Sequence, residues 1–284
     1  MPETYWVRSG RELLQDIDQA AVPPGFLYLW YLGQMSLVIK GAGLIVYIDP
    51  YLVHPRAQDP LGRVSPLKFP PPFAAEEVHH AMVVLGTHNH SDHINIPTLK
   101  GIFAGSPEAR FVVPAPHKEL LVSAGIPAAS VMEAVAGETL AYRELQVIPL
   151  PAAHEELEQD EEGRFVSLCY LIRLNGVTLF HGGDTVEYPG LVTSLREYAV
   201  DICFLPINGR DLRRREQGII GNMNFREAAD AGRAAGARLL IPGHYDLFPT
   251  NSENPAFFAD YLYRTYPDQP FKIMVPGERL VYTP

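Results

Sequence analysis

Thr87-His88-Asn89-His90-Ser91-Asp92-His93 is the stretch from which the rest of this sequence is best interpreted. It places three histidines and one aspartate within six residues, directly after the apolar run 81–86. That run is short, rich in β-branched residues and closed by glycine, as is typical of a buried strand. The polar cluster therefore follows a strand end, where the chain turns and its side chains can converge on one point.

The spacing within this cluster favours metal binding. In extended backbone, His88 and His90 project to the same side, and Asp92 and His93 follow where the chain curls. Neutral imidazole and carboxylate are the usual ligands of zinc and similar divalent ions. Two ions a few ångströms apart would fit such a set of donors. The plainer alternative is a solvated histidine-rich loop.

Three later strands also end in a residue that can bind metal. His154 follows the apolar run 146–150, Asp184 follows 177–180 through two glycines, and His244 follows 238–241. A simple Gly-Gly-Asp turn is the alternative at Asp184. Earlier in the chain, Asp49 ends the run 44–49, where an acid often orients a neighbouring ligand by hydrogen bonding.

The composition limits the classes of partner. The 284-residue chain has a formal charge of −10, with 47% hydrophobic and 20% charged residues. An acidic chain is a poor binder of nucleic acid or anionic membranes, because both need a basic surface. No signal-like segment opens the sequence, so we expect a cytoplasmic protein. Cys169 and Cys203 lie in apolar runs and are expected to be buried hydrophobic residues.

The order of predicted elements favours a layered α/β structure. The proline-rich segment 53–75 is a long loop, of the kind that forms lids or binding segments. The predicted helices cover residues 11–21, 96–103, 117–124, 225–235 and 253–266. The predicted strands cover residues 26–32, 36–40, 44–49, 111–113, 138–141, 146–150, 166–174, 177–180, 201–205, 238–241 and 271–282.

Arginines gather in one segment of this acidic chain. Arg213, Arg214 and Arg215 follow the strand 201–205, together with Asn208 and Arg210. A charge run is usually a solvated face. After a strand that ends near the metal ligands, it is also a candidate anion-binding loop.

The HxHxDH pattern resembles the signature of the metallo-β-lactamase superfamily, and the chain looks most like its L-ascorbate-6-phosphate lactonase group. The resemblance is carried by 30–33, 87–92, 181–184 with Tyr188, 209–210 and 241–246. It implies an α/β (α+β) fold, a four-layer αβ/βα sandwich formed by one domain over residues 1–284. In that fold the metals lie between the edges of two sheets. Two departures are a shorter 53–75 loop and the presence of His154, a ligand that the lactonases lack.

The resemblance also implies roles for the candidate residues. One ion would be held by His88, His90 and His154, the second by Asp92, His93 and His244, with Asp184 between them. Zn²⁺ is the first expectation, with Mn²⁺ or Fe²⁺ as alternatives. Asp92 and Asp184 would be the catalytic acids, and Asp49 would support a ligand. Substrate contacts would come from Asn208, Arg210, Arg213, Tyr188 and Tyr245.

The expected activity is metal-dependent hydrolysis of a small ester or lactone by a metal-activated hydroxide, phosphorylated sugar lactones included. A metal-dependent phosphodiesterase is the main alternative, and a non-enzymatic metal-binding scaffold is another. The expected partner is a small anionic molecule, not nucleic acid or a membrane. A homo-oligomer is compatible with the sequence.

Overall fold

The computed structural model describes residues 5–54 and 66–284 of the chain. Residues 55–65 of the predicted loop 53–75 therefore lie outside the described residues. In the part that is described, no helix is long and apolar enough to cross a membrane.

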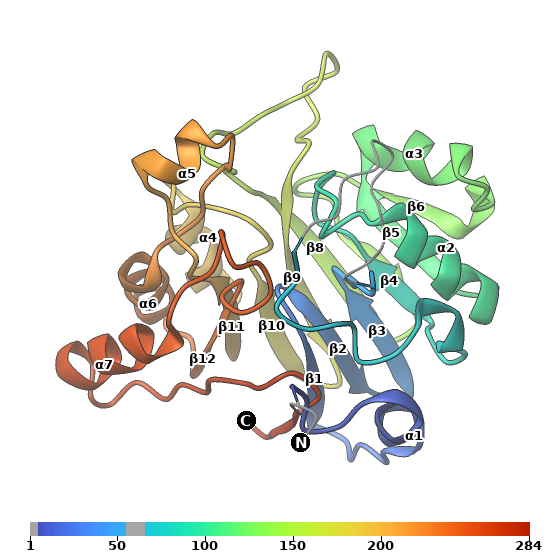
Figure 1. The fold of residues 1–284 in the computed structure, drawn as a ribbon, viewed down its shortest axis with the longest axis horizontal. Coiled ribbons are helices and arrows are strands. Elements are labelled where there is room, and N and C mark those ends of the chain that lie inside the picture. Colours follow the sequence, from blue (N-terminus) through green and yellow to red (C-terminus); the bar gives the residue numbers. More distant parts are fainter. Residues whose placement is uncertain (1–4, 55–65) are drawn as a thin grey trace.

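Two β-sheets form the centre of the molecule (Figure 1). The first sheet has seven strands, in the order β13 (Arg279–Tyr282), β1 (Leu27–Gly33), β2 (Ser36–Gly41), β3 (Leu44–Ile48), β4 (Val83–Leu85), β5 (Arg110–Pro114) and β6 (Val131–Ala134). The second has six, in the order β12 (Leu239–Gly243), β11 (Ile202–Pro206), β10 (Val177–His181), β9 (Leu168–Leu174), β8 (Leu145–Pro151) and β7 (Leu140–Tyr142).

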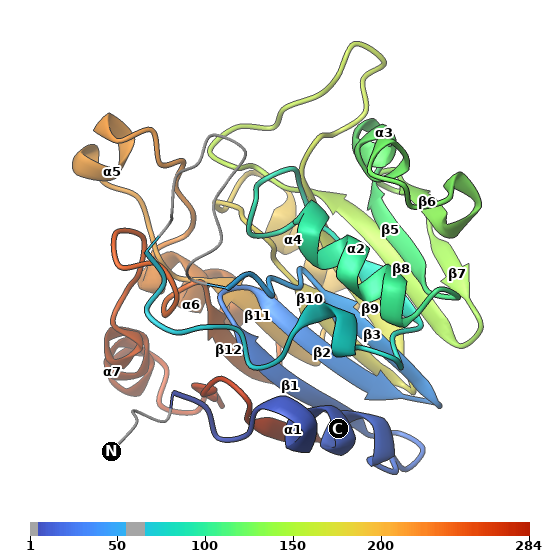
Figure 2. The same ribbon diagram turned by 45° about the vertical axis from the view of Figure 1, so that its right-hand side comes forward.

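Helices cover the outer face of each sheet, as Figures 1 and 2 show. On the first sheet lie α1 (Gly10–Gln19), α2 (Ile96–Gly105) and α3 (Lys118–Ser123), with the short 3₁₀ helices η1 (Ala75–Glu77), η2 (Ala115–His117) and η3 (Ala128–Ser130) in the same half. On the second lie α4 (Leu191–Glu197), α6 (Phe225–Ala234) and α7 (Pro255–Thr265), while α5 (Leu212–Glu216) stands apart. The fold is an αβ/βα sandwich, as predicted.

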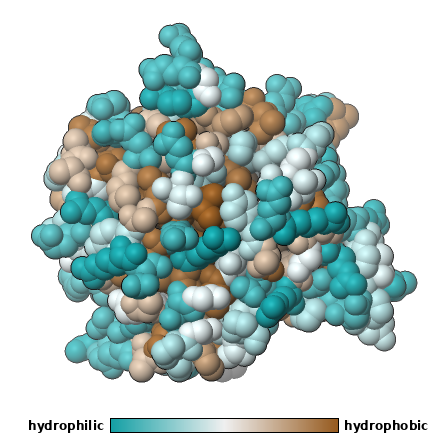
Figure 3. Space-filling model, turned by 180° about the vertical axis from the view of Figure 1, so that it is seen from behind, coloured by the Kyte–Doolittle hydropathy of each residue, from teal (hydrophilic) through white to brown (hydrophobic). Residues whose placement is uncertain are grey.

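The layers follow from the alternation of apolar side chains along each strand. In β1, Leu29 and Tyr31 point into the core between the sheets, whereas Trp30 and Leu32 point into the core beneath the helices. Successive side chains of a strand face opposite sides, so a strand that is apolar throughout must be covered on both. Figure 3 shows that hydrophilic residues are interspersed with apolar ones on the face turned away in Figure 1.

Most predicted elements are confirmed, with small shifts of their ends. The hairpin β9–β10 turns at Asn175 and Gly176, whose φ angles of 53° and 84° suit the predicted two-residue turn. Cys169 and Cys203 are buried, as expected. The structure differs from the prediction in three respects. β6 and α4 were not predicted, and the arginine run forms the helix α5 instead of a loop. In the C-terminal segment, only residues 279–282 form a strand.

Candidate metal centre

The candidate ligands come from four strand ends at one edge of the sandwich. The tight turn after β4 carries the cluster 88–93, and His154, Asp184 and His244 follow β8, β10 and β12. In the second sheet, β10 and β12 both run parallel to β11, and β8 and β10 each pair antiparallel with β9. The carboxyl ends of β8, β10 and β12 therefore meet at the same edge, which explains the convergence of distant residues.

Four of the side chains form one donor group. Nδ1 of His90 lies 3.0 Å from Nε2 of His88 and 3.1 Å from Nε2 of His154. Oδ2 of Asp184 lies 3.7 Å from Nε2 of His154. One donor atom from each of these four residues lies within 4.8 Å of the others, close enough to share an ion.

A second donor group lies beside the first. Nε2 of His93 and Nε2 of His244 lie 3.6 and 3.8 Å from Oδ2 of Asp92. Asp184 reaches this group as well, with 3.3 Å from its Oδ1 to His93 and 3.2 Å from its Oδ2 to His244. The structure thus brings all seven predicted ligands together, and Asp184 lies between the two groups.

The unpaired atoms of the cluster fit divalent cations. Nε2 of His93, Nδ1 of His154 and Oδ1 of Asp184 are buried and have no hydrogen-bond partner in the described part of the chain. Buried polar atoms are rarely left in this state, and an ion would satisfy those that face the cluster. Five imidazoles and two carboxylates are also the donor types that zinc, manganese and iron accept.

The electrostatics of the cluster differ between its members. Burial lowers the pKa of His88 and lowers that of His154 to about 4, so both imidazoles are neutral and ready to bind metal. Burial alone would also lower the pKa of His93 and His244, but neighbouring carboxylates, Asp184 foremost, hold both above their ordinary value. Burial would raise the pKa of Asp184, but these two histidines hold it low. The carboxylates of the second donor group therefore favour positive charge at His93 and His244.

Asp49 supports the cluster from behind, where it was expected. Its Oδ2 lies 2.7 Å from Nδ1 of His93, and its carboxylate accepts hydrogen bonds from the backbone N–H and the hydroxyl of Thr87. This contact fixes the ring of His93 with Nε2 directed at Asp184. The sequence did not predict that Thr87 would contact Asp49, because a single threonine at a strand end carries no distinctive signal.

The candidate substrate residues are mostly engaged with the protein itself. Asn208 is buried and bonded to Asn222 and Asn251. Arg210 makes two hydrogen bonds to the carboxylate of Glu227. Their roles in substrate binding stay predictions.

The two tyrosines are engaged in the same way. The hydroxyl of Tyr188 donates to Pro151 O at 2.6 Å. Tyr245 is buried against Tyr31 and donates to Met274 O. Arg213 is exposed, and no partner of its side chain is found among the described residues.

Two further observations concern residues near the cluster. His181 is fully buried, and its Nε2 lies 2.9 Å from the carbonyl oxygen of Met35. Gln34 was missed by the sequence reasoning, although its side chain contacts Asp92 and His244. Gln34 is a polar residue directly after the strand that ends in Gly33. The candidate ligands also follow strand ends, so this position could have indicated that Gln34 lies near them.

Comparison with known proteins agrees with this geometry. The model of the family described as "Beta-lactamase superfamily domain" matches residues 46–245. A UPF0173 metal-dependent hydrolase from Nitratidesulfovibrio vulgaris (strain DP4) is 30% identical over 202 residues, which are 70% of this chain and 77% of that protein. A probable L-ascorbate-6-phosphate lactonase, UlaG, from Escherichia coli O127:H6 is 23% identical over 280 residues, covering 87% and 77%.

Solved structures show the same fold. Igni18, a novel metallo hydrolase from the hyperthermophilic archaeon Ignicoccus hospitalis, superposes with a TM-score of 0.69 at 20% identity, covering 90% of this chain and 98% of that one. The family match spans more than half of the chain and contains all seven candidate ligands. The chain therefore belongs to the β-lactamase superfamily and, within it, to the metal-dependent hydrolases.

Proposed function

We propose that this chain hydrolyses a small ester or lactone that carries an anionic group, phosphorylated sugar lactones included, in the cytoplasm. The observation that carries the proposal is the pair of donor groups joined by Asp184. The similarity to a probable L-ascorbate-6-phosphate lactonase supports the lactone class. We expect two divalent cations, Zn²⁺ first, with Mn²⁺ or Fe²⁺ as alternatives.

The cluster would use these ions to activate water. A divalent ion bound in such a site lowers the pKa of water from about 15.7 to roughly 7 and stabilises negative charge on a carbonyl oxygen. The chain holds the donor side chains in place and keeps most of them buried, where electrostatic interactions are strong. Asp184, with 5% of its side chain exposed, orients the histidines of the second group.

Asp92 is the acid that can reach the substrate, because 16% of its side chain is exposed. We assign to its carboxylate the transfer of a proton from the attacking water to the leaving oxygen. In a lactone, the water oxygen forms a bond to the acyl carbon and the ring C–O bond breaks. The proton carried by Asp92 then ends on the released alkoxide oxygen.

Arg213 is the best candidate for binding the anionic group. Arg213 lies in helix α5, which contacts the chain next to His154. In this contact, Nη2 of Arg215 lies 3.2 Å from a carboxylate oxygen of Glu155, the residue after His154. Arg210 already pairs with Glu227, so it would have to leave that partner first. Arg213 has no such competitor in the described chain.

A substrate panel tests the proposed activity. Metal-loaded protein is expected to open lactones, phosphorylated ones fastest, and to cleave bis-p-nitrophenyl phosphate slowly. Faster cleavage of the phosphodiester would replace the proposal by the phosphodiesterase alternative. No hydrolysis of any compound in a broad panel would favour a metal-binding scaffold.

The role of Arg213 is tested by its alanine variant. Arg213→Ala is expected to raise KM for phosphorylated lactones about 10-fold, because about one charge-assisted contact is lost. KM for uncharged lactones should stay unchanged. Arg11→Ala is the matched control, because Arg11 is an exposed arginine of α1. An equal KM for phosphorylated lactones in both variants would remove Arg213 from the substrate site.

A further inference from the structure

Gln34 occupies an unusual place in the turn between β1 and β2. Its side chain is fully buried, and its backbone has a φ of +59°, in the left-handed region that costs a non-glycine residue energy. The backbone N–H donates to Oδ1 of Asp246 at 2.9 Å, and the carbonyl accepts the N–H of His244 at 2.8 Å. The turn is therefore held in this conformation from both sides.

The strained turn directs the amide of Gln34 into the second donor group. The atom assigned as Nε2 lies 2.9 Å from Oδ2 of Asp92, and it lies 2.8 Å from Nε2 and 3.1 Å from Nδ1 of the His244 ring. Ligand atoms about 2.0–2.2 Å from one ion lie roughly 3 Å from each other. The amide thus lies at the distance from Asp92 and His244 that ligands of one ion keep.

The amide orientation follows from the charge at this point. The oxygen and nitrogen of a glutamine exchange places by a half-turn of the terminal torsion. With nitrogen toward the cluster, Oε1 is buried and has no hydrogen-bond partner in the described chain. A cation between Asp92 and His244 repels the N–H groups and attracts the carbonyl oxygen, so metal binding favours the turned amide.

We propose that Gln34 supplies its amide oxygen as a further ligand of the ion held by Asp92, His93 and His244. This proposal rests on the proposed function only because it requires bound cations. With Asp184 included, that ion would then have three oxygen and two nitrogen donors, whereas the other group offers three imidazoles and one carboxylate. Oxygen donors favour harder ions. The second position should therefore favour Mn²⁺ or Fe²⁺ more than the first does.

Metal titration of two Gln34 variants tests the proposal. Competition with a chromophoric chelator measures the affinities for Zn²⁺ and Mn²⁺ separately. Gln34→Leu removes every donor and is expected to weaken the second ion at least about 10-fold, Mn²⁺ more than Zn²⁺, while the first ion binds as in wild type. Gln34→Glu keeps an oxygen at the same place and is expected to bind the second ion as tightly as wild type or tighter.

Gln269→Leu is the matched control. Gln269 is also a buried glutamine, but its amide bonds to Ala237 O and Pro270 O, neither of which belongs to the cluster. Its variant should keep both metal affinities. Melting in excess chelator reports on folding without metal, and if Gln34→Leu does not fold, Gln34→Glu decides alone.

Two results would overturn the proposal. Wild-type affinity for the second ion in Gln34→Leu would show that the amide binds no metal. Weaker binding in Gln34→Glu would show that Gln34 acts as an N–H donor to Asp92, a role that a carboxylate cannot replace. Both readouts are binding affinities, so they remain decisive even if the proposed hydrolysis fails.

Discussion

Asp49 shapes the metal centre without belonging to either donor group. It follows β3, has a φ of +44°, and bonds to both Thr87 and His93. Removing such a partner loosens the ring of a ligand and usually weakens metal binding about 10- to 100-fold. The strained backbone at this residue places the carboxylate under the turn that carries the cluster.

Asp49→Asn should therefore weaken metal binding by about 10- to 100-fold, because the amide nitrogen cannot accept a hydrogen bond and at least one of the three contacts with Thr87 and His93 is lost. Chelator competition measures the effect. Asp201→Asn is a suitable control, since Asp201 is a buried carboxylate that accepts the N–H of Thr178 at the opposite end of β10. Equal metal affinity in the two variants would contradict the role given to Asp49.

His80 gives the fold a sensitivity to acid that is separate from the metal ligands. Its ring contacts the hydroxyl of Tyr47 at 2.8 Å, and burial lowers its pKa from 6.5 to about 4. As the pH falls, the unfolded chain therefore binds a proton at His80 at a higher pH than the folded chain does. Stability from this residue is present above pH 6.5 and is lost as the pH falls toward 4.

His80→Gln should flatten this part of the pH dependence. Urea unfolding at intervals between pH 7.5 and 4 should show wild type losing stability relative to the variant as the pH falls, because the variant has no group that titrates there. Parallel curves for the two proteins would show that His80 does not contribute.

At the residue scale, the sequence predicted which side chains meet in the cluster. Each of the seven candidate ligands follows a strand end, and these strand ends meet in space, so order along the chain was enough. Arg210 pairs with Glu227, a partner 17 positions away that only tertiary structure identifies. Gln34, whose side chain contacts Asp92 and His244, was not predicted to be near the cluster, because a single glutamine in a turn resembles an ordinary loop residue.

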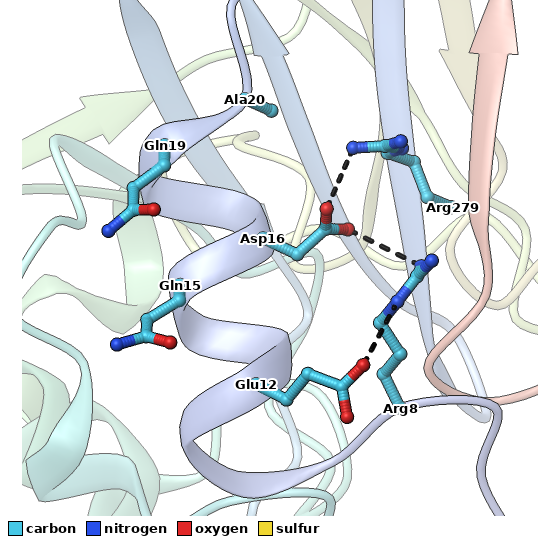
Figure 4. Close-up of a pocket in the computed structure, with 7 residues that line it drawn as sticks. All are labelled: Arg8, Glu12, Gln15, Asp16, Gln19, Ala20 and Arg279. Carbon is cyan, nitrogen blue, oxygen red and sulfur yellow. Dashed lines mark hydrogen bonds and ion pairs between the residues drawn. The ribbon is translucent and has the colours of Figure 1, made fainter.

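At the element scale, α1 is fixed to the first sheet by Asp16. Figure 4 shows its carboxylate between Arg8 and Arg279, the latter at 2.7 Å. The same carboxylate accepts the indole N–H of the fully buried Trp30 at 2.7 Å. Leu13 and Ile17 of the same helix enter the core beneath the helices. The helix is thus held by both apolar and polar contacts.

Asp16→Ala should destabilise the fold by about 1–3 kcal/mol, because it leaves the indole N–H of Trp30 buried without a partner. Denaturant unfolding measures the loss. Glu12→Ala lies one turn earlier, where Glu12 is exposed and, among the described residues, forms an ion pair only with Arg8, so its effect should stay within about 0.5 kcal/mol. Similar losses in both variants would mean that the contacts of Asp16 add no stability.

The elements that the sequence missed have weak local signals. β6 is only four residues long, which is too short to show a clear alternation of buried and exposed positions. α4 is preceded by Gly190, which has no side chain that could cap the helix. The arginine run forms a helix of only five residues, which is too short to show an apolar periodicity. Asp211 begins that helix by accepting the N–H of Arg214, a capping signal present in the sequence.

At the scale of the whole molecule, the two sheets bring the donor groups together. The cluster 88–93 belongs to the first sheet, and His154, Asp184 and His244 belong to the second. The sandwich was predicted through the resemblance of the HxHxDH pattern, since apolar periodicity alone does not specify which strands share a sheet. The metal centre thus depends on correct packing of both halves.

The most direct test of this account is the metal content of the purified chain, measured together with lactone hydrolysis before and after stringent chelation. We predict two divalent ions per chain, loss of hydrolysis when they are removed, and recovery when they are restored. Hydrolysis that continues unchanged in metal-free protein would contradict the account.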